Sequence, residues 1–216
     1  MANITVKHAL DMVQDQAQDE DEDLWDIEDL INWYNQGTRV IVSLDPRANS
    51  VIEPVKLASG VRQVCPAGSV GFIGVLRNMG TDGATAGRGV FPTTLEALTA
   101  YSPSYSTETA AEVVFNAMPD IADKTRYFVY PPSDGEGYVE LEHGKVPAAV
   151  VYDEDGNWES NLVGIRENYL DALFNYLWYR MFQKDTDVPS EKSAEFYALF
   201  LSAMGMGTGT QKQGEG

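Results

Sequence analysis

Apolar residues recur every three or four positions near the N-terminus, a period that indicates amphipathic helices. The spacing predicts one helix over residues 5–18, with Thr5 as its N-cap, and a second over residues 25–44. Acidic residues crowd the first turns of the second helix, where the helix dipole favours anions, and Pro46 follows its end. Both helices should bury one face against the rest of the protein.

The same period returns near the C-terminus. It predicts a helix over residues 165–184 with a wide apolar face, and a last helix over residues 191–204 that Gly205 ends. A helix that is apolar over so much of its surface must touch several elements or another subunit. The glycine-rich tail, residues 205–216, has no apolar pattern, so we expect it to be disordered on its own.

Between these ends the period changes to two, which indicates β-strands. Residues 53–57 and 61–65 flank Ala58-Ser59-Gly60 and predict a hairpin, and residues 70–76 predict a further strand that carries two glycines. Four more strands are predicted at residues 111–115, 126–130, 138–142 and 146–152. In the third of these, polar and apolar residues alternate, so one face should be exposed.

Two shorter signals lie among the strands. A capping box from Thr93 to Glu96 predicts a short helix that ends near Tyr101. The glycine-rich loop 78–89 should be mobile. It lacks the following helix and the lysine that a phosphate-binding loop needs, so the sequence predicts no nucleotide site.

Together the elements predict an α+β protein: a four-helix bundle built from the N- and C-terminal helices, with a central antiparallel β insertion. Residues 1–50 and 161–204 would supply the helices of the bundle. Residues 51–160 would form the β-rich insertion with one short helix, and residues 205–216 the flexible tail.

Composition narrows the classes of function. The chain has 216 residues, 44% of them apolar, and a formal net charge of −18. So acidic a chain repels DNA phosphate, which argues against sequence-specific binding of nucleic acid. The charge fits either ordinary solubility or a wall past which DNA slides without adhering.

Signals for catalysis or cofactors are missing from the sequence. Cys65 is the only cysteine, so an intrachain disulfide is impossible, and neither His8 nor His143 lies in a recognisable motif. The acidic run at residues 19–23 predicts a solvated loop, because its spacing is not that of an EF-hand. We therefore expect no enzyme, no metal and no zinc, haem, flavin or nicotinamide cofactor. No signal peptide or membrane span is indicated either, so folding in a cytoplasm is expected.

Several motifs, taken in order, resemble one family. They are Gly60-x-x-Gln63-x-x-Pro66, then Arg77-Asn78-Met79-Gly80-x-Asp82-Gly83, then the pair of segments 128–132 and 137–140, and finally segment 172–180 with Lys184-Asp185. This order and spacing resembles the phage adaptor proteins, the head–tail connectors of tailed bacteriophages. The likeness extends over residues 4–204 and includes the family's later hairpin and its C-terminal helix. The acidic run 19–23 and the glycine-rich tail depart from the pattern.

The resemblance implies a structural protein of the virion. Such adaptors form a ring, usually of twelve copies, between the portal and the tail, and the ring extends the DNA channel. The implied partners are other copies of this chain, the portal protein, a tail or neck protein, and passing DNA that is not read by sequence. The implied location is the virion neck, after synthesis in the cytoplasm of the bacterial host. In related connectors the β region projects toward the tail and the C-terminal segment reaches into the portal.

Candidate interface residues follow from this resemblance and from the scarcity of cations. They are Arg77, Asn78, Met79, Arg88, Arg180, Gly205, Met206 and Gly207. The arginines would form salt bridges between subunits or to the portal, although a local ion pair is an equally good explanation for each. Two other functions remain open: a tail-completion protein, and a soluble hydrolase or small-molecule-binding enzyme with a pocket between bundle and sheet.

Overall fold

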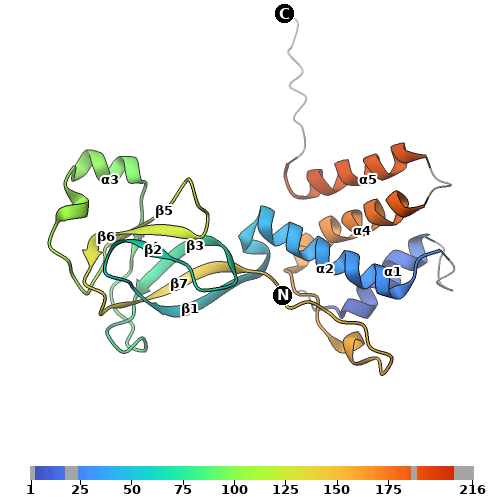
Figure 1. Cartoon of the computed structure of the whole chain (residues 1–216), viewed down its shortest axis with the longest axis horizontal. Coiled ribbons are helices and arrows are strands. Elements are labelled where there is room, and N and C mark those ends of the chain that lie inside the picture. The colour runs from blue at the N-terminus through green and yellow to red at the C-terminus, as the bar shows by residue number, and fades with distance from the viewer. Residues whose placement is uncertain (1–2, 18–23, 186–188, 207–216) are drawn as a thin grey trace, which may run out of the picture. The chain divides into compact units, whose positions relative to one another are not determined.

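The computed structural model describes residues 3–17, 24–185 and 189–206 of the chain (Figure 1). The chain forms two compact units. Met1–Ala48 and Pro147–Gly216 make up a helical unit, and Asn49–Val146 make up a β unit. The β unit is therefore inserted between two segments that belong together, and each unit buries a core of its own.

Helices occur at all four of the places that the periodicity predicted. In the helical unit they are α1 (Val6–Ala17), α2 (Ile27–Leu44), α4 (Leu170–Lys184) and α5 (Ser190–Ala203). The hydroxyl of Thr5 accepts a hydrogen bond from the backbone N–H of His8 at 3.2 Å, which confirms it as the cap of α1. The α4 helix begins five residues later than predicted, because a 3-10 turn, η4 (Glu167–Tyr169), precedes it.

The predicted four-helix bundle is wrong. The chain has five α-helices and two β-sheets among the described residues, so it is a mixed α+β protein. In the helical unit, α4 packs against α2 and α5 (Figure 1), whereas α1 packs mainly against the 3-10 helix η3 (Asn157–Ser160). Helices alone therefore do not close this core.

An irregular segment before α4 fills the place that a helix would take in a bundle. Its buried side chains are Val150, Trp158, Val163 and Ile165. The amide of Asn35 on α2 accepts from the backbone N–H of Val150 at 2.9 Å and donates to its carbonyl at 2.7 Å. Because a helix side chain satisfies this backbone, no strand forms there, and the strand predicted at residues 146–152 is wrong.

Aromatic side chains attach α5 to α4. Phe182 stacks on Phe196 with ring centroids 5.3 Å apart, and Tyr176 meets Phe200 edge-on at 5.5 Å. Gly205, with φ of +72°, ends α5 as predicted, and its N–H donates to the carbonyl of Ser202 while the Met206 N–H donates to that of Leu201. These two bonds form a Schellman motif, in which glycine is favoured by the left-handed backbone.

Seven strands form two sheets in the β unit. The three-stranded sheet has the order β1-β7-β3, and the four-stranded sheet has the order β2-β6-β5-β4. The strands are β1 (Ser50–Lys56), β2 (Gly60–Val64), β3 (Ser69–Asn78), β4 (Phe91–Pro92), β5 (Asn116–Pro119), β6 (Arg126–Ser133) and β7 (Tyr138–Lys145). All pairs are antiparallel except β4 with β5, which is parallel.

The hairpin predicted for residues 53–57 and 61–65 is wrong, and so is the later hairpin that the resemblance implies for segments 128–132 and 137–140, although the strands exist. β1 pairs with β7, whereas β2 pairs with β6 in the other sheet. At the turn between β1 and β2, the buried amide of Gln63 accepts from the N–H of Ala58 at 2.7 Å and donates to the carbonyls of Ala58 and Gly60. This side chain satisfies the turn, so the chain crosses to the second sheet. β6 and β7 likewise lie in different sheets.

A single apolar core joins the strands of the β unit. Val139 and Leu141 on the central strand β7 are fully buried, while the alternating Glu140 and Glu142 are partly exposed, as the alternation predicted. Phe72 stacks on Tyr127 of the other sheet with ring centroids 4.7 Å apart. The two sheets therefore share one hydrophobic interior.

Two local predictions in the β unit need correction. The short helix α3 (Leu95–Tyr101) is capped by Thr94, whose hydroxyl accepts from the N–H of Ala97 at 3.1 Å, so the box that begins at Thr93 is wrong. Residues 111–115 are irregular, and β5 begins only at Asn116. The N–H of Ala111 donates to the carbonyl of Pro132, so this stretch follows β6 without pairing along its length.

Candidate functional site

Asn78, a candidate interface residue, is buried at the end of β3 with 4% of its surface exposed. Its side-chain oxygen accepts from the N–H of Val114 at 2.9 Å, and its amide nitrogen donates to the carbonyls of Val114 and Arg88 at 2.9 and 3.0 Å. Its backbone N–H donates to the same Arg88 carbonyl. Asn78 therefore holds the loop that follows β3 and has no surface to offer a partner in this conformation.

Backbone hydrogen bonds fix both ends of the loop after Asn78, and at its far end the N–H of Gly87 donates to the carbonyl of Asn78. The N–H of Met79 donates to the carbonyl of Tyr138 at 2.7 Å, and the N–H of Tyr138 donates to the carbonyl of Gly80 at 2.8 Å. Within the loop, hydrogen bonds from the backbone N–H groups of Ala84 and Thr85 lower the pKa of the exposed Asp82 carboxyl to about 2. Asp82 thus remains ionised and shapes the turn.

The two candidate arginines of the β unit have local contacts. The Nε of Arg77 donates to Glu140 on the neighbouring strand at 2.7 Å, in register with it across the ladder. The guanidinium of Arg88 lies 4.8 Å from the centre of the Phe115 ring. Both arginines are exposed, so each can also reach a partner.

The remaining candidates belong to the helical unit. The guanidinium of Arg180 on α4 donates to the side chain of Gln36 on α2 at 2.7 Å. Gly205 and Met206 follow α5 and close its C-terminal end with their backbone N–H groups, and Met206 is 51% exposed. Gly207, the rest of the tail and the acidic run at residues 19–23 lie outside the described residues. The candidate interface residues are thus divided between the two units.

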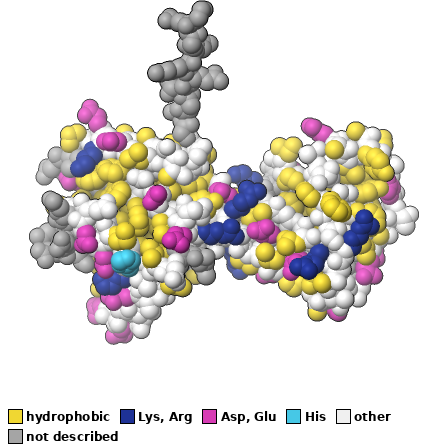
Figure 2. Space-filling model, turned by 180° about the vertical axis from the view of Figure 1, so that it is seen from behind, with side chains coloured by type: hydrophobic (Ala, Val, Ile, Leu, Met, Phe, Trp, Pro, Cys, Tyr) yellow, Lys and Arg dark blue, Asp and Glu magenta, His cyan; other side chains and the backbone are white. Residues whose placement is uncertain are grey.

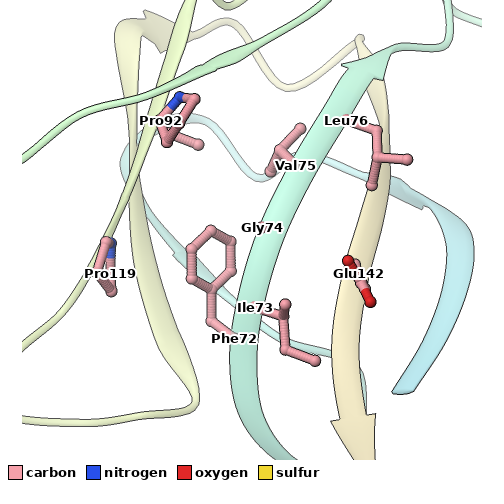
Figure 3. Close-up of a pocket in the computed structure, with 9 residues that line it drawn as sticks. Phe72, Ile73, Gly74, Val75, Leu76, Pro92, Pro119 and Glu142 are labelled. Carbon is pink, nitrogen blue, oxygen red and sulfur yellow. The ribbon is translucent and has the colours of Figure 1, made fainter. Parts of the chain in front are cut away.

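The structure also contains a groove that the sequence analysis missed. It has a volume of about 260 Å³ and is lined on one side by β3 and on the other by Pro92 and Pro119 (Figure 3). Gly74 lies in the middle of the β3 segment, and Glu142 of β7 is its partner in the sheet register. The available signal was the glycine inside a predicted strand, since such a glycine marks a bulge or a close approach of another chain.

A serine, a histidine and a glutamate lie together in the three-stranded sheet. His143 Nδ1 is 2.8 Å from the Ser69 hydroxyl, and His143 Nε2 donates to Glu53 at 3.1 Å. However, the imidazole is fully buried, and the Ser69 hydroxyl donates its proton to the carbonyl of Pro66 at 2.6 Å. A nucleophilic serine must direct this proton at its base and meet substrate, so the trio links three strands and has no catalytic geometry.

Neither a metal centre nor a membrane span is found among the described residues. Within residues 3–17, 24–185 and 189–206, no group of three or more His, Cys, Asp or Glu side chains is placed to hold a metal ion. None of the described helices is long and apolar enough to cross a membrane.

Large apolar side chains are exposed on both units, as Figure 2 shows for one face of each. On the β unit the most exposed are Ile121, Tyr101, Val64 and Phe91. On the helical unit they include Val151, Leu162, Leu199 and Met206.

Comparison with known sequences gives one family. Curated proteins yield no match to the chain. The family described as SU10 adaptor protein matches it over residues 4–215, a range that includes both units. The chain therefore belongs to the SU10 adaptor protein family, as its resemblance to phage adaptor proteins predicted.

Proposed function

We propose that this chain joins head to tail in the particle of a tailed phage, as an adaptor ring between the portal and the tail that extends the DNA channel. The observation that carries this proposal is the family match over residues 4–215, which covers nearly all of the 216 residues. The partners are other copies of the chain, the portal protein and a tail or neck protein. The location is the neck of the virion.

The distribution of exposed apolar side chains supports assembly into a ring. A closed ring of identical subunits uses heterologous contacts, in which one surface of a subunit meets a different surface of the next. Each unit supplies exposed apolar residues, such as Phe91 on β4 and Leu199 on α5. Exposed apolar side chains are therefore available on both units for such contacts. We keep twelve copies, the number implied by the resemblance, as the number to test.

Charge supports a channel that DNA passes without adhering. The helical unit contains 22 acidic and 8 basic residues, a net charge of −14, and the β unit contains 11 acidic and 7 basic residues, a net charge of −4. Acidic walls repel phosphate and prevent stable binding of the genome. The helical unit is accordingly the better candidate for the channel wall.

Labelling of particles tests the proposal directly. An antibody raised against the purified chain, applied to tailed particles of the source phage, should label the neck in electron micrographs. Antibody absorbed beforehand with the purified chain should give no label. Particles without any label, together with absence of the chain from their mass spectra, would overturn the proposal.

The same antibody separates the adaptor from a tail-completion protein. Filled heads that lack tails should carry label at one vertex, because an adaptor joins the portal before the tail arrives. Label on free tails and not on tailless heads would instead identify a tail-completion protein.

Truncation tests the proposed attachment of the C-terminal segment to the portal. A chain that ends at Met206 keeps the Schellman bonds that close α5, so it should fold normally and fail to bind purified portal. Binding is measured by co-sedimentation with portal rings. Equal binding by the full-length and shortened chains would contradict attachment through the C-terminal segment.

A further inference from the structure

We propose that the groove around Gly74 is the docking site for an extended segment of a different protein of the particle, a segment that carries an aliphatic side chain close to a lysine or arginine. The proposal rests on the proposed function only in taking the partner from the same particle. Three features of the β unit point to a docking site.

The first feature is the glycine. Gly74 lies inside β3, where glycine is unfavourable because it gains no packing and loses more backbone entropy than other residues. Its φ is outside the left-handed region, and a Cβ built on it would meet no atom within 4 Å. Neither backbone conformation nor close packing within the chain thus requires glycine here, and the space it leaves is open.

The second feature is the wall of the groove. Apart from Gly74 and Glu142, its lining is apolar: Phe72 and Val75 of β3 lie toward Pro92 and Pro119, and Leu76 lies on the other side of the strand with Glu142 (Figure 3). Proline lacks an N–H, so the two prolines present apolar surface without an additional unpaired donor. Such a groove suits an aliphatic side chain carried by an extended backbone.

The third feature is Glu142, which supplies the charge at this site. Its carboxylate is half-buried opposite Gly74 and makes no hydrogen bond or ion pair with any residue that the structure describes. A carboxylate held beside an apolar wall without a partner is unfavourable. A lysine or arginine of the docked segment would offset this cost and would fix the direction of the segment.

The chain's own tail does not fit this description. Residues 207–216 contain Lys212 but no aliphatic or aromatic side chain that could enter the groove. The occupant is therefore assigned to another protein and not to the C-terminal segment of this chain.

Peptide binding to the full-length chain provides the test. An array of overlapping short peptides, covering the other structural proteins of the particle and this chain itself, is probed with labelled full-length protein. The best binders are then measured in solution by fluorescence anisotropy. We expect them to come from another protein and to place an aliphatic residue near a lysine or arginine.

Substitutions in the groove decide whether these peptides bind there. Gly74→Val fills the open space and suits a strand, and Glu142→Lys reverses the charge, so each should weaken binding by about tenfold or more. Glu154→Lys makes the same charge change on the helical unit and should leave the affinity unchanged. Circular dichroism and the protection of Cys65 from alkylation verify that each variant is folded.

Three results would overturn the inference: no peptide binds, the binders ignore both groove substitutions, or the binders come from this chain itself. The proposed function fails separately, because it depends on finding the chain in purified particles by mass spectrometry. If the chain is present in particles but neither Gly74→Val nor Glu142→Lys weakens peptide binding, only the inference about the groove is refuted.

Discussion

At the scale of single residues, buried polar side chains hold the β unit together where regular pairing stops. Gln63 closes the turn between β1 and β2, Asn78 holds the loop after β3, and His143 links three strands. Each is buried and bonded, as buried polar groups must be. Two of them, Gln63 and Asn78, belong to the motifs that resemble the family, so those motifs record structural needs.

Removing the Asn78 amide should therefore destabilise the β unit. Asn78→Ala leaves the buried N–H of Val114 without its acceptor, which should cost about 2–4 kcal/mol in the free energy of unfolding. Urea unfolding followed through the reactivity of Cys65 measures the loss. Asn175→Ala, where the amide donates only to its own helix, is the control and should change little. If Asn78→Ala lowers the free energy of unfolding by no more than Asn175→Ala does, the Asn78 side chain does not stabilise the β unit.

Cys65 provides a pH-dependent test of the same core. Burial, and secondarily the charge of Asp123, raise the pKa of the thiol to about 11 from an ordinary value of 9.0. Between pH 9.0 and about 11, the Cys65 thiol therefore keeps its proton in the folded state and loses it in the unfolded state. The contribution to stability is complete below the unfolded pKa and is lost as pH rises through the folded one.

Alkylation by iodoacetamide should consequently follow the raised pKa. In the native protein the reaction should remain slow near pH 9 and accelerate toward pH 11, whereas the urea-unfolded chain should already react at the lower pH. The free energy of unfolding should fall over the same interval by more in the native sequence than in Cys65→Ala. Identical pH profiles for folded and unfolded chains would contradict this expectation.

At the scale of elements, α5 depends on aromatic contacts with one neighbouring helix. Its buried anchor is Phe200, 1% exposed, which meets Tyr176 of α4, while Phe196 meets the rings of Trp178 and Phe182 on the same helix. Much of the opposite surface of α5 is exposed. An element that packs against one neighbour opens more readily than one packed on several sides, so α5 should have a lower opening free energy than α4.

Phe200→Ala should therefore release α5 selectively. Truncation of a fully buried phenylalanine costs about 3–5 kcal/mol, enough to expose the amides of α5 to hydrogen exchange while α2 stays protected. Tyr197→Ala removes an aromatic ring that is 42% exposed and should cost clearly less. Equal loss of protection in α2 and α5 would show that the helices open together.

At the scale of the whole molecule, the tryptophans and the cysteine, which can report unfolding, lie in different units. All four tryptophans, Trp25, Trp33, Trp158 and Trp178, belong to the helical unit, whereas the single cysteine, Cys65, belongs to the β unit. Tryptophan fluorescence and cysteine reactivity consequently follow the unfolding of separate units. Coincident transitions would show that the units unfold cooperatively.

Tryptophan fluorescence and Cys65 reactivity can show whether the uneven charge destabilises one unit more than the other. Salt screens repulsion among like charges, so sodium chloride should stabilise the helical unit, with net charge −14, by roughly 1 kcal/mol. The midpoint of urea unfolding by tryptophan fluorescence should rise with salt, and the midpoint by Cys65 reactivity should rise less. A fall, or an equal rise in both, would mean that self-repulsion is not concentrated in the helical unit.

The sequence by itself determined where the helices and most strands lie and to which family the chain belongs. These features depend on neighbours along the chain: the spacing of Val6, Leu10 and Val13 in α1, or the alternation around Val139 and Leu141 in β7. Family motifs are likewise read in order along the sequence. These local patterns therefore do not depend on how distant parts of the chain pack.

Only the tertiary structure decided which elements pair. β7 lies between β1 and β3, although it follows both by many residues, and this arrangement replaces the two predicted hairpins. The segment before α4 supplies core that a bundle would take from helices, because Asn35 and Tyr34 satisfy its backbone. The groove shows the same dependence, since Glu142 comes to lie opposite Gly74 only when β7 pairs with β3. Pairing is settled by hydrogen bonds and burial between distant residues, and no local period encodes them.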